Sequence, residues 1–300
     1  MNNSLVLGVD IGGSHITSAL VDIYTGSILR ESYVRKHVDS HQQADKIIYA
    51  WSEAIKESFS LAGLEVGKIG IAMPGPLDYE LGVCWIKDQD KYEHLYGLNV
   101  KELLAEQLGI TTADIRIMND ACCFLQGEVL GTLDNDYNTV MGFTLGTGLG
   151  SASYKDGVVT DADLWRMAFR DGIAEDYLST RWFTNRYEEL KGETVLNVKH
   201  LIDCLEKDPA VRSIFEEFGE TLGAFVNECV EKYKPEAIVF GGNIAKCADL
   251  YLHITEEVLD RTGNRLPLKL AALGEEAALI GAAGSWKKAL SAAETAAIVK

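Results

Sequence analysis

Val9-Asp-Ile-Gly-Gly-Ser-His-Ile16 is the stretch that decides the fold, because it recurs in altered form as Phe143-Thr-Leu-Gly-Thr-Gly-Leu-Gly150. In both stretches an apolar strand runs into a turn of small residues, and a second strand follows. An α/β unit that occurs twice in one chain predicts two lobes with a cleft between them. The repeat is short, so the prediction also depends on the motifs outside it.

Strands and helices alternate along the chain, which is typical of α/β proteins. The helix predicted over 43–62 places Ile47, Trp51 and Ile55 on one face, and apolar residues recur at the same spacing over 210–233. The other predicted helices are 100–108, 121–130, 245–259 and 275–290, and the predicted strands are 5–11, 16–22, 27–34, 69–73, 115–118, 139–145, 150–154, 158–160 and 237–240.

Composition limits the class of protein. The 300 residues are 47% hydrophobic and 24% charged, which is ordinary for one large globular domain or two smaller ones. There are 28 basic and 45 acidic residues, and the net charge of −17 repels phosphate backbones. We therefore expect no nucleic-acid partner.

Localisation follows from what the sequence lacks. The six cysteines form no Cys-x-x-Cys pair, and the first residues have no basic segment of the kind that opens a signal peptide. The uncharged run 277–286 is too short to span a bilayer. These observations predict a reduced, cytoplasmic, soluble protein without a membrane partner.

Two glycine-rich turns are candidates for binding a polyphosphate. Glycine lets backbone N–H groups approach a phosphate closely because no Cβ intervenes, as expected for the turn Gly12-Gly13-Ser14. Asp10, at the end of the preceding strand, could hold Mg²⁺ through water. The turn Gly146-Thr147-Gly148 offers a second cradle. Either one alone could be an ordinary hairpin turn, but the pair favours a nucleotide site.

Two further motifs follow predicted strands. Asp120 comes directly after the strand 115–118, where a carboxylate can accept the proton of a hydroxyl during phosphoryl transfer, and Asn119 can bond a neighbouring hydroxyl. The alternative is that Asp120 caps the helix behind it. Gly241-Gly242 would let an adenine ring lie against the backbone, although a plain strand–helix turn accounts for them equally well.

Taken together, the motifs resemble the ROK family of sugar kinases, within the superfamily of actin, hexokinase and chaperone ATPases. The resemblance rests on seven segments that occur in the family's order over nearly the whole chain, namely 9–14, 70–78, 118–121, 143–150, 175–179, 239–245 and 273–283. Each segment is degenerate, whereas their combination in this order is specific.

The resemblance implies a role for each matching position. It implies ATP and Mg²⁺ as cofactors, a small-molecule sugar as substrate and a homodimer as the assembly. Asp120 would be the catalytic base, Asn119 and Glu175 would bind sugar hydroxyls, and Gly75 would lie in the loop lining the sugar site. The implied contacts to nucleotide and magnesium are Asp10, Gly12, Gly13, Ser14, Gly146, Thr147, Gly148, Gly241 and Gly242.

One segment departs from the family pattern. Members typically carry zinc on a Cys-rich stretch and a His just before the position of Glu175, but residues 163–174 here are shortened and contain neither residue type. We therefore predict that zinc is absent. The family's Glu-Leu-Gly-His becomes Asp163-Leu-Trp-Arg166, so Asp163 and Arg166 become candidate sugar ligands. Arg166 would donate to sugar hydroxyls or pair with Glu175, unless the segment is merely solvated.

The expected fold is therefore a two-lobed α/β structure of the actin-like, ribonuclease H-like type. We expect the lobes over 1–118 and 119–284, with a helix over 285–300 packing on the first. The expected activity is ATP-dependent phosphorylation of a hexose or amino-sugar hydroxyl. The alternatives are a catalytically impaired sugar-binding homologue and a sugar-responsive regulator without a DNA-binding domain, since the first strand begins at Leu5 and leaves no room for a preceding helix-turn-helix.

Overall fold

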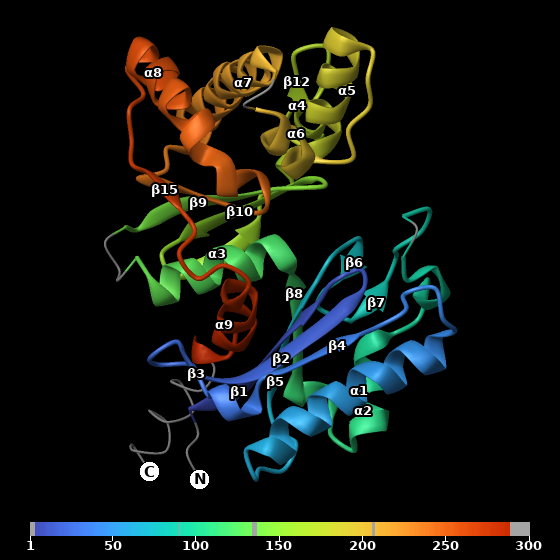
Figure 1. Cartoon of the computed structure of the whole chain (residues 1–300). Helices are drawn as coiled ribbons and strands as arrows, with labels where there is room; N and C mark the ends of the chain where they lie inside the picture. The colour runs from blue at the N-terminus through green and yellow to red at the C-terminus, as the bar shows by residue number, and fades with distance from the viewer. Residues whose placement is uncertain (1–3, 90, 134–136, 206–207, 289–300) are drawn as a thin grey trace. The chain divides into compact units, whose positions relative to one another are not determined.

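The chain divides into two compact units in the computed structural model, which describes residues 4–89, 91–133, 137–205 and 208–288 (Figure 1). The first unit covers Met1–Asn135 and resumes at Glu275, and the second covers Asp136–Gly274. The first unit thus extends beyond the expected boundary at 118, because helices α3 (Asp120–Gly131) and α9 (Glu276–Gly284) pack tightly against each other within it. Most of the helix expected over 285–300 lies outside the described residues.

The first unit is built on a six-stranded sheet with the order β3-β2-β1-β5-β8, in which β4 also pairs with β2. Strand β1 is antiparallel to β2 and parallel to β5, and β5 is parallel to β8. The elements of this unit, besides α3 and α9, are β1 Leu5–Ile11, β2 His15–Asp22, β3 Ser27–Ile28, β4 Val34–His37, α1 Ala44–Leu61, β5 Ile69–Met73, β6 Leu77–Asp78, β7 Val83–Cys84, α2 Val100–Leu108 and β8 Ile115–Asn119.

The strand expected over 27–34 is interrupted, and a side chain explains why. The 3-10 helix Arg30–Ser32 separates β3 from β4. The Ser32 hydroxyl accepts a hydrogen bond from the Leu20 N–H (2.8 Å) and donates to the Leu29 carbonyl (2.6 Å). A serine side chain therefore takes the place of a main-chain partner of β2, and the strand breaks there.

The two faces of this sheet carry residues of different size. Ile69, Ile71 and Met73 are buried in the same apolar cluster as residues of α1 and α2. Gly70, which alternates with them, faces α9, and a Cβ on Gly70 would lie 1.9 Å from the Ala282 carbonyl oxygen. The close approach of α9 to the sheet is therefore possible because this face presents small residues.

The second unit repeats the strand arrangement of the first. Its five-stranded sheet has the order β11-β10-β9-β14-β15, with β9 antiparallel to β10 and parallel to β14. This repeated strand order confirms that the two glycine-containing stretches begin two copies of one α/β unit. The elements are β9 Thr139–Leu145, β10 Leu149–Lys155, β11 Val158–Asp161, β12 Ala168–Phe169, β13 Gly172–Ile173, α4 Ala174–Tyr177, α5 Thr180–Lys191, α6 Val198–Cys204, α7 Pro209–Tyr233, β14 Ala237–Gly241, α8 Leu252–Thr262 and β15 Leu268–Leu270.

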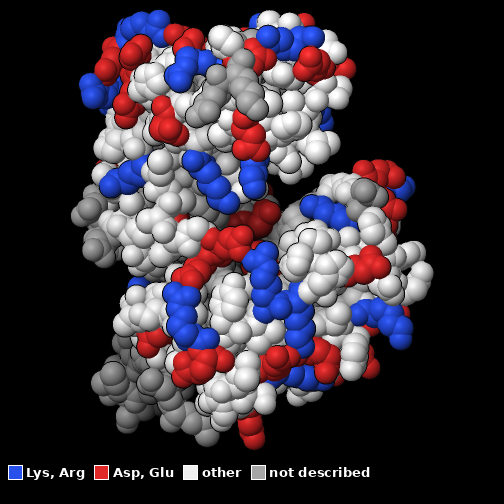
Figure 2. Space-filling model, viewed as in Figure 1, with Lys and Arg blue, Asp and Glu red and all other residues white. Residues whose placement is uncertain are grey.

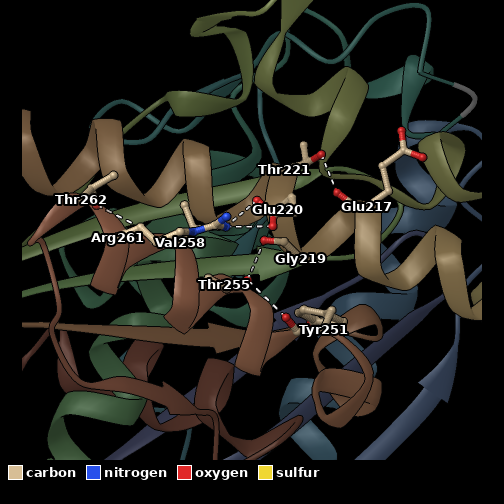
Figure 3. Close-up of polar contacts among 9 residues, drawn as sticks. All are labelled: Glu217, Gly219, Glu220, Thr221, Tyr251, Thr255, Val258, Arg261 and Thr262. Atoms are coloured by element: carbon tan, nitrogen blue, oxygen red, sulfur yellow. Dashed lines mark hydrogen bonds and ion pairs between the residues drawn. The ribbon is translucent and has the colours of Figure 1, made fainter.

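Helices α7 and α8 pack closely on each other in the second unit (Figure 3). A Cβ on Gly219 would lie 2.7 Å from the Tyr251 carbonyl oxygen, so glycine is needed for the helices to approach this closely. The Thr255 hydroxyl donates to the Gly219 carbonyl (3.0 Å), and Arg261 donates to both carboxylate oxygens of Glu220 at 2.8 Å. These contacts hold α8 against α7.

The helix expected over 245–259 is divided at Tyr251. A 3-10 helix, Ile244–Leu250, precedes α8, and Cys247 within it has non-helical dihedral angles. The buried Tyr251 hydroxyl donates to the Ile244 carbonyl (3.1 Å). This bond across the 3-10 segment fixes the bend between the two helices.

Two features bear on the expected partners and localisation, namely the distribution of surface charges and the length and polarity of the helices. Acidic and basic side chains are interspersed over the face of the molecule seen in Figure 2. No helix in the described part of the chain is long and apolar enough to cross a membrane. The expectations about nucleic acid, assembly and localisation stay predictions.

Candidate active site

The first phosphate loop, which we define as residues 12–14, connects β1 to β2 in the first unit. The Gly12 N–H donates to the His15 carbonyl (2.9 Å), which closes a tight turn. Gly13 and Ser14 are exposed, and the Ser14 hydroxyl lies 2.9 Å from His15 Nδ1. The loop therefore has the short, accessible backbone that an anion requires.

The buried side chain of Tyr92 holds this loop in place. Its hydroxyl donates to the Gly12 carbonyl at 2.5 Å, and its ring packs edge-on against Trp51 with the centroids 5.3 Å apart. Burial raises the pKa of the Tyr92 hydroxyl far above its ordinary value of 10.0, so it remains a donor. Sequence analysis missed Tyr92, because 80 residues separate it from Gly12 and no local pattern marks the contact.

Lys91 borders the same loop. Its Cδ would lie 3.8 Å from a Cβ placed on Gly13, and the side chain is partly buried. Lys91 directly precedes Tyr92, whose hydroxyl is bonded to Gly12 of the loop. A cation at this position suits a phosphate ligand, and no motif in the sequence indicated it.

Asp10 stands in an acidic environment at the end of β1. Burial raises its pKa from the ordinary 3.8 to about 6, and the carboxylates of Asp120 and Glu275 add to the rise, while Arg35 opposes it. Arg35 forms an ion pair with Glu275. Three carboxylates thus share one region of the first unit, where a cation would relieve their repulsion.

Asn119, rather than Asp120, caps helix α3. The Asn119 side-chain oxygen accepts hydrogen bonds from the N–H groups of Ala121 (2.9 Å) and Cys122 (3.3 Å). Asp120 is exposed, and one of its oxygens also accepts from the Ala121 N–H at 2.9 Å. Asp120 therefore lies at the carboxyl end of β8, where its carboxylate also contacts the start of α3.

The expected sugar loop is connected to Asn119 through Tyr79. Asn119 Nδ2 donates to the Tyr79 hydroxyl (3.2 Å), which donates to the Met73 carbonyl (3.2 Å). A Cβ on Gly75 would lie 3.0 Å from the same hydroxyl, so Gly75 packs closely against Tyr79. An amide nitrogen carries two N–H donors, and one of those of Asn119 bonds Tyr79. Sequence analysis missed Tyr79, although it directly follows the family segment 70–78.

The second phosphate loop, residues 146–148, connects β9 to β10 in the second unit. The Gly146 N–H donates to the Gly148 carbonyl (3.1 Å), and Thr147 is exposed at the tip. A Cβ on Gly146 would have no atom within 4 Å outside its own chain neighbours, so open space faces this residue. Glu175 lies against the loop, because its carboxylate accepts a hydrogen bond from the Leu149 N–H at 3.0 Å.

The glycines expected at the adenosine lie beside this second loop. Gly241 pairs with Thr144 across β14 and β9. Gly242 has a left-handed φ of 86°, and a Cβ on it would lie 2.3 Å from the Leu145 carbonyl oxygen. Only glycine fits there, and the two glycine segments are neighbours at one end of the sheet.

Arg166 pairs with Asp163 rather than with Glu175. The side chains of Arg166 and Asp163 are 66% and 37% exposed. The Asp163 N–H donates to a carboxylate oxygen of Asp161 (2.8 Å), which holds the segment in a turn. Arg166 therefore does not fix Glu175, whose carboxylate is held by Leu149 instead.

Within the described residues, no group of three or more His, Cys, Asp or Glu side chains is arranged to hold a metal ion. Magnesium in phosphoryl-transfer sites usually takes only one or two carboxylates, and water and phosphate complete its shell. Asp10 beside Asp120 fits that limited role.

The repeated sheet and its two glycine loops define a two-lobed α/β protein of the actin-like ATPase class. The model of the ROK family matches residues 6–166 and 170–289, and the chain belongs to this family. An N-acetyl-D-glucosamine kinase from Haemophilus influenzae is 26% identical over 92% of this chain and 97% of its own length.

Two solved structures confirm the fold. A ROK hexokinase from Thermus thermophilus superimposes with a TM-score of 0.83 at 22% identity, over 96% of this chain and 99% of that one. A ROK family glucokinase from Streptomyces griseus, solved with glucose and AMPPNP, gives a TM-score of 0.72 at 23% identity, over 95% and 99% of the two chains.

Proposed function

We propose that the chain is an ATP-dependent sugar kinase that phosphorylates a hydroxyl group of an N-acetylhexosamine or hexose, with Asp120 as the general base. The observation that carries this proposal is the position of Asp120 at the carboxyl end of β8, close enough to Asp10 to raise its pKa. Membership of the ROK family and the N-acetylglucosamine kinase among its relatives support the same activity.

Asp120 performs the proton transfer in this proposal. Its carboxylate accepts the proton of the sugar hydroxyl as that oxygen attacks the terminal phosphorus of ATP, and ADP leaves. Asn119 caps α3 one residue earlier, which fixes the backbone at Asp120, and its amide group would bond a sugar hydroxyl. The Gly75 loop, tied to Asn119 through Tyr79, lines the sugar site.

The nucleotide is held by backbone groups. The loop 146–148 and Gly241–Gly242 offer glycine surfaces to the phosphates and the adenosine, and Gly12, Gly13 and Ser14 offer a second set of donors. Asp10 would hold Mg²⁺ through water, and the ion would neutralise the negative charge of the phosphates. Lys91, beside Gly13, adds a positive charge to this anion site.

The experiment that tests the proposal is a measurement of ADP release against a panel of hexoses and N-acetylhexosamines, with mass spectrometry of the product. We expect one sugar class to stimulate ADP release and to gain one phosphate. If sugars bind but none stimulates ADP release, the chain is a binding protein and the kinase proposal is wrong.

A further inference from the structure

The segment 174–180 holds both ends of the second phosphate loop. The Thr180 N–H and hydroxyl donate to the Gly146 carbonyl at 2.7 and 2.9 Å. At the other end, Glu175 accepts the Leu149 N–H at 3.0 Å. The segment that carries the expected sugar ligand is therefore hydrogen-bonded to the loop that is expected to bind phosphate, within one compact unit.

The carboxylate of Glu175 lies directly against this loop. A Cβ on Gly148 would be only 2.5 Å from Glu175 Oε2, so the oxygen occupies space that any other residue would fill. Glu175 also accepts the hydrogen bond of the Leu149 N–H. Phosphate-binding loops use backbone N–H donors of this kind to bind phosphate. An ionised carboxylate at this distance repels a phosphate on the same loop.

The backbone at Glu175 is fixed by its two neighbours in the chain. Ala174 is fully buried, and the Asp176 carboxylate accepts a hydrogen bond from the Ile173 N–H (3.1 Å), which fixes the start of α4. Glu175 itself is only partly buried. A rotation about its side-chain bonds is enough to break the contact with Leu149, and no element has to move.

We propose that Glu175 couples the two substrates of the kinase. Without sugar, the Glu175 carboxylate occupies the Leu149 N–H by a hydrogen bond and repels the phosphate groups of the nucleotide. Sugar hydroxyls, which are donors, draw the carboxylate away, so the N–H becomes free for phosphate and the local repulsion falls. Sugar therefore strengthens nucleotide binding, and by linkage nucleotide strengthens sugar binding equally. This coupling rests on the proposed function and adds a positioning role to Glu175.

The test is equilibrium binding of AMPPNP with Mg²⁺ to the full chain, with and without a saturating sugar identified by the panel. For the unsubstituted chain we expect the sugar to lower the nucleotide Kd about fivefold or more, within the usual range of coupling between sites. Glu175→Gln retains the shape but not the charge. It should bind AMPPNP without sugar nearly as tightly as the unsubstituted chain does with sugar.

A neighbouring acidic residue provides the matched control. Asp176→Asn removes one charge from the next position, but this residue bonds Ile173 and Arg181 rather than the loop. It should retain the full effect of sugar on nucleotide binding. Glu175→Ala should lose the effect as Glu175→Gln does, which covers the case in which one variant fails to fold.

Two outcomes would overturn the coupling. Either Glu175→Gln keeps the full effect of sugar on AMPPNP binding, or the unsubstituted chain phosphorylates a sugar that leaves the nucleotide Kd unchanged. A wrong kinase proposal would give a different result from a wrong coupling proposal, because no sugar would then stimulate ADP release. Even so, the sugar-free comparison of Glu175→Gln with the unsubstituted chain would decide whether Glu175 opposes nucleotide.

Discussion

The acidic environment of Asp10 has a measurable cost in stability. Its pKa rises from 3.8 to about 6 because of burial and of the carboxylates of Asp120 and Glu275. A tenfold change in a proton-binding constant corresponds to about 1.4 kcal/mol, so this rise in pKa destabilises the folded chain by on the order of 3 kcal/mol once Asp10 is ionised. Asp10→Asn removes this cost because an amide does not ionise.

The sign of the pH dependence follows from proton binding. Between about pH 4 and 6 the folded chain holds the Asp10 proton and the unfolded chain has released it, so Asp10 makes stability fall as pH rises through this range. Asp10→Asn should therefore match the unsubstituted chain near pH 4 and exceed it by on the order of 3 kcal/mol at pH 7.

The assay is urea unfolding from pH 4 to 8 with chelator present and without nucleotide, since Mg²⁺ or phosphate would alter the charges around Asp10. Asp22→Asn is the control, because it should change the stability at neutral pH in the opposite direction. Burial alone would raise the pKa of Asp22, but hydrogen bonds from Ser4, Thr25 and Tyr24 outweigh it and lower the pKa. That variant should lose stability at neutral pH. A constant difference between Asp10→Asn and the unsubstituted chain across this range would refute the reasoning.

Four further substitutions test the site and the fold. Asp120→Asn should lower kcat by a factor of about 10² or more with little change in sugar KM, because the amide cannot accept the proton; kinetics with the preferred sugar measure this. Gly146→Val should raise the KM for ATP more than that for sugar and leave the melting temperature unchanged, because open space faces the residue. Lys91→Ala should raise the KM for ATP about tenfold or more, because a hydrogen bond to a charged group contributes about 1.5–3 kcal/mol, with partial recovery in Lys91→Arg. Gly223→Ala should destabilise the chain by about 1–2 kcal/mol in urea unfolding, because its Cβ would lie 2.6 Å from Val258 Cβ, which outweighs the better helix propensity of alanine.

The Lys91 prediction has a matched control variant, and each of the other three has a result that would refute it. Lys87 is exposed on the same segment as Lys91 and lies over the Tyr96 ring, so Lys87→Ala should leave the KM for ATP unchanged. Near-normal turnover of Asp120→Asn would remove Asp120 from the base role. An unaltered KM and kcat for ATP in Gly146→Val would exclude the second loop from the phosphate site. Unchanged stability of Gly223→Ala would show that α7 and α8 separate easily.

The sequence alone determined what depends on neighbours in the chain. A strand–glycine–strand pattern that occurs twice specifies the two β-hairpins, and both sheets have the strand order this duplication requires. Apolar spacing located α1 and α7 because one face of each helix must be buried. Glycines mark the loops themselves, since only they allow the backbone conformation and close approach seen at Gly242.

Tertiary structure decided which distant side chains complete those loops. The bond of Tyr92 to Gly12 and that of Glu175 to Leu149 join segments that no local pattern relates. Arg166 illustrates the same limit: its charge predicted a carboxylate partner, but the turn at Asp163 placed the nearer carboxylate beside it. Periodicity reports which face of an element is buried, whereas the identity of a polar partner depends on where the packed elements bring the chain together.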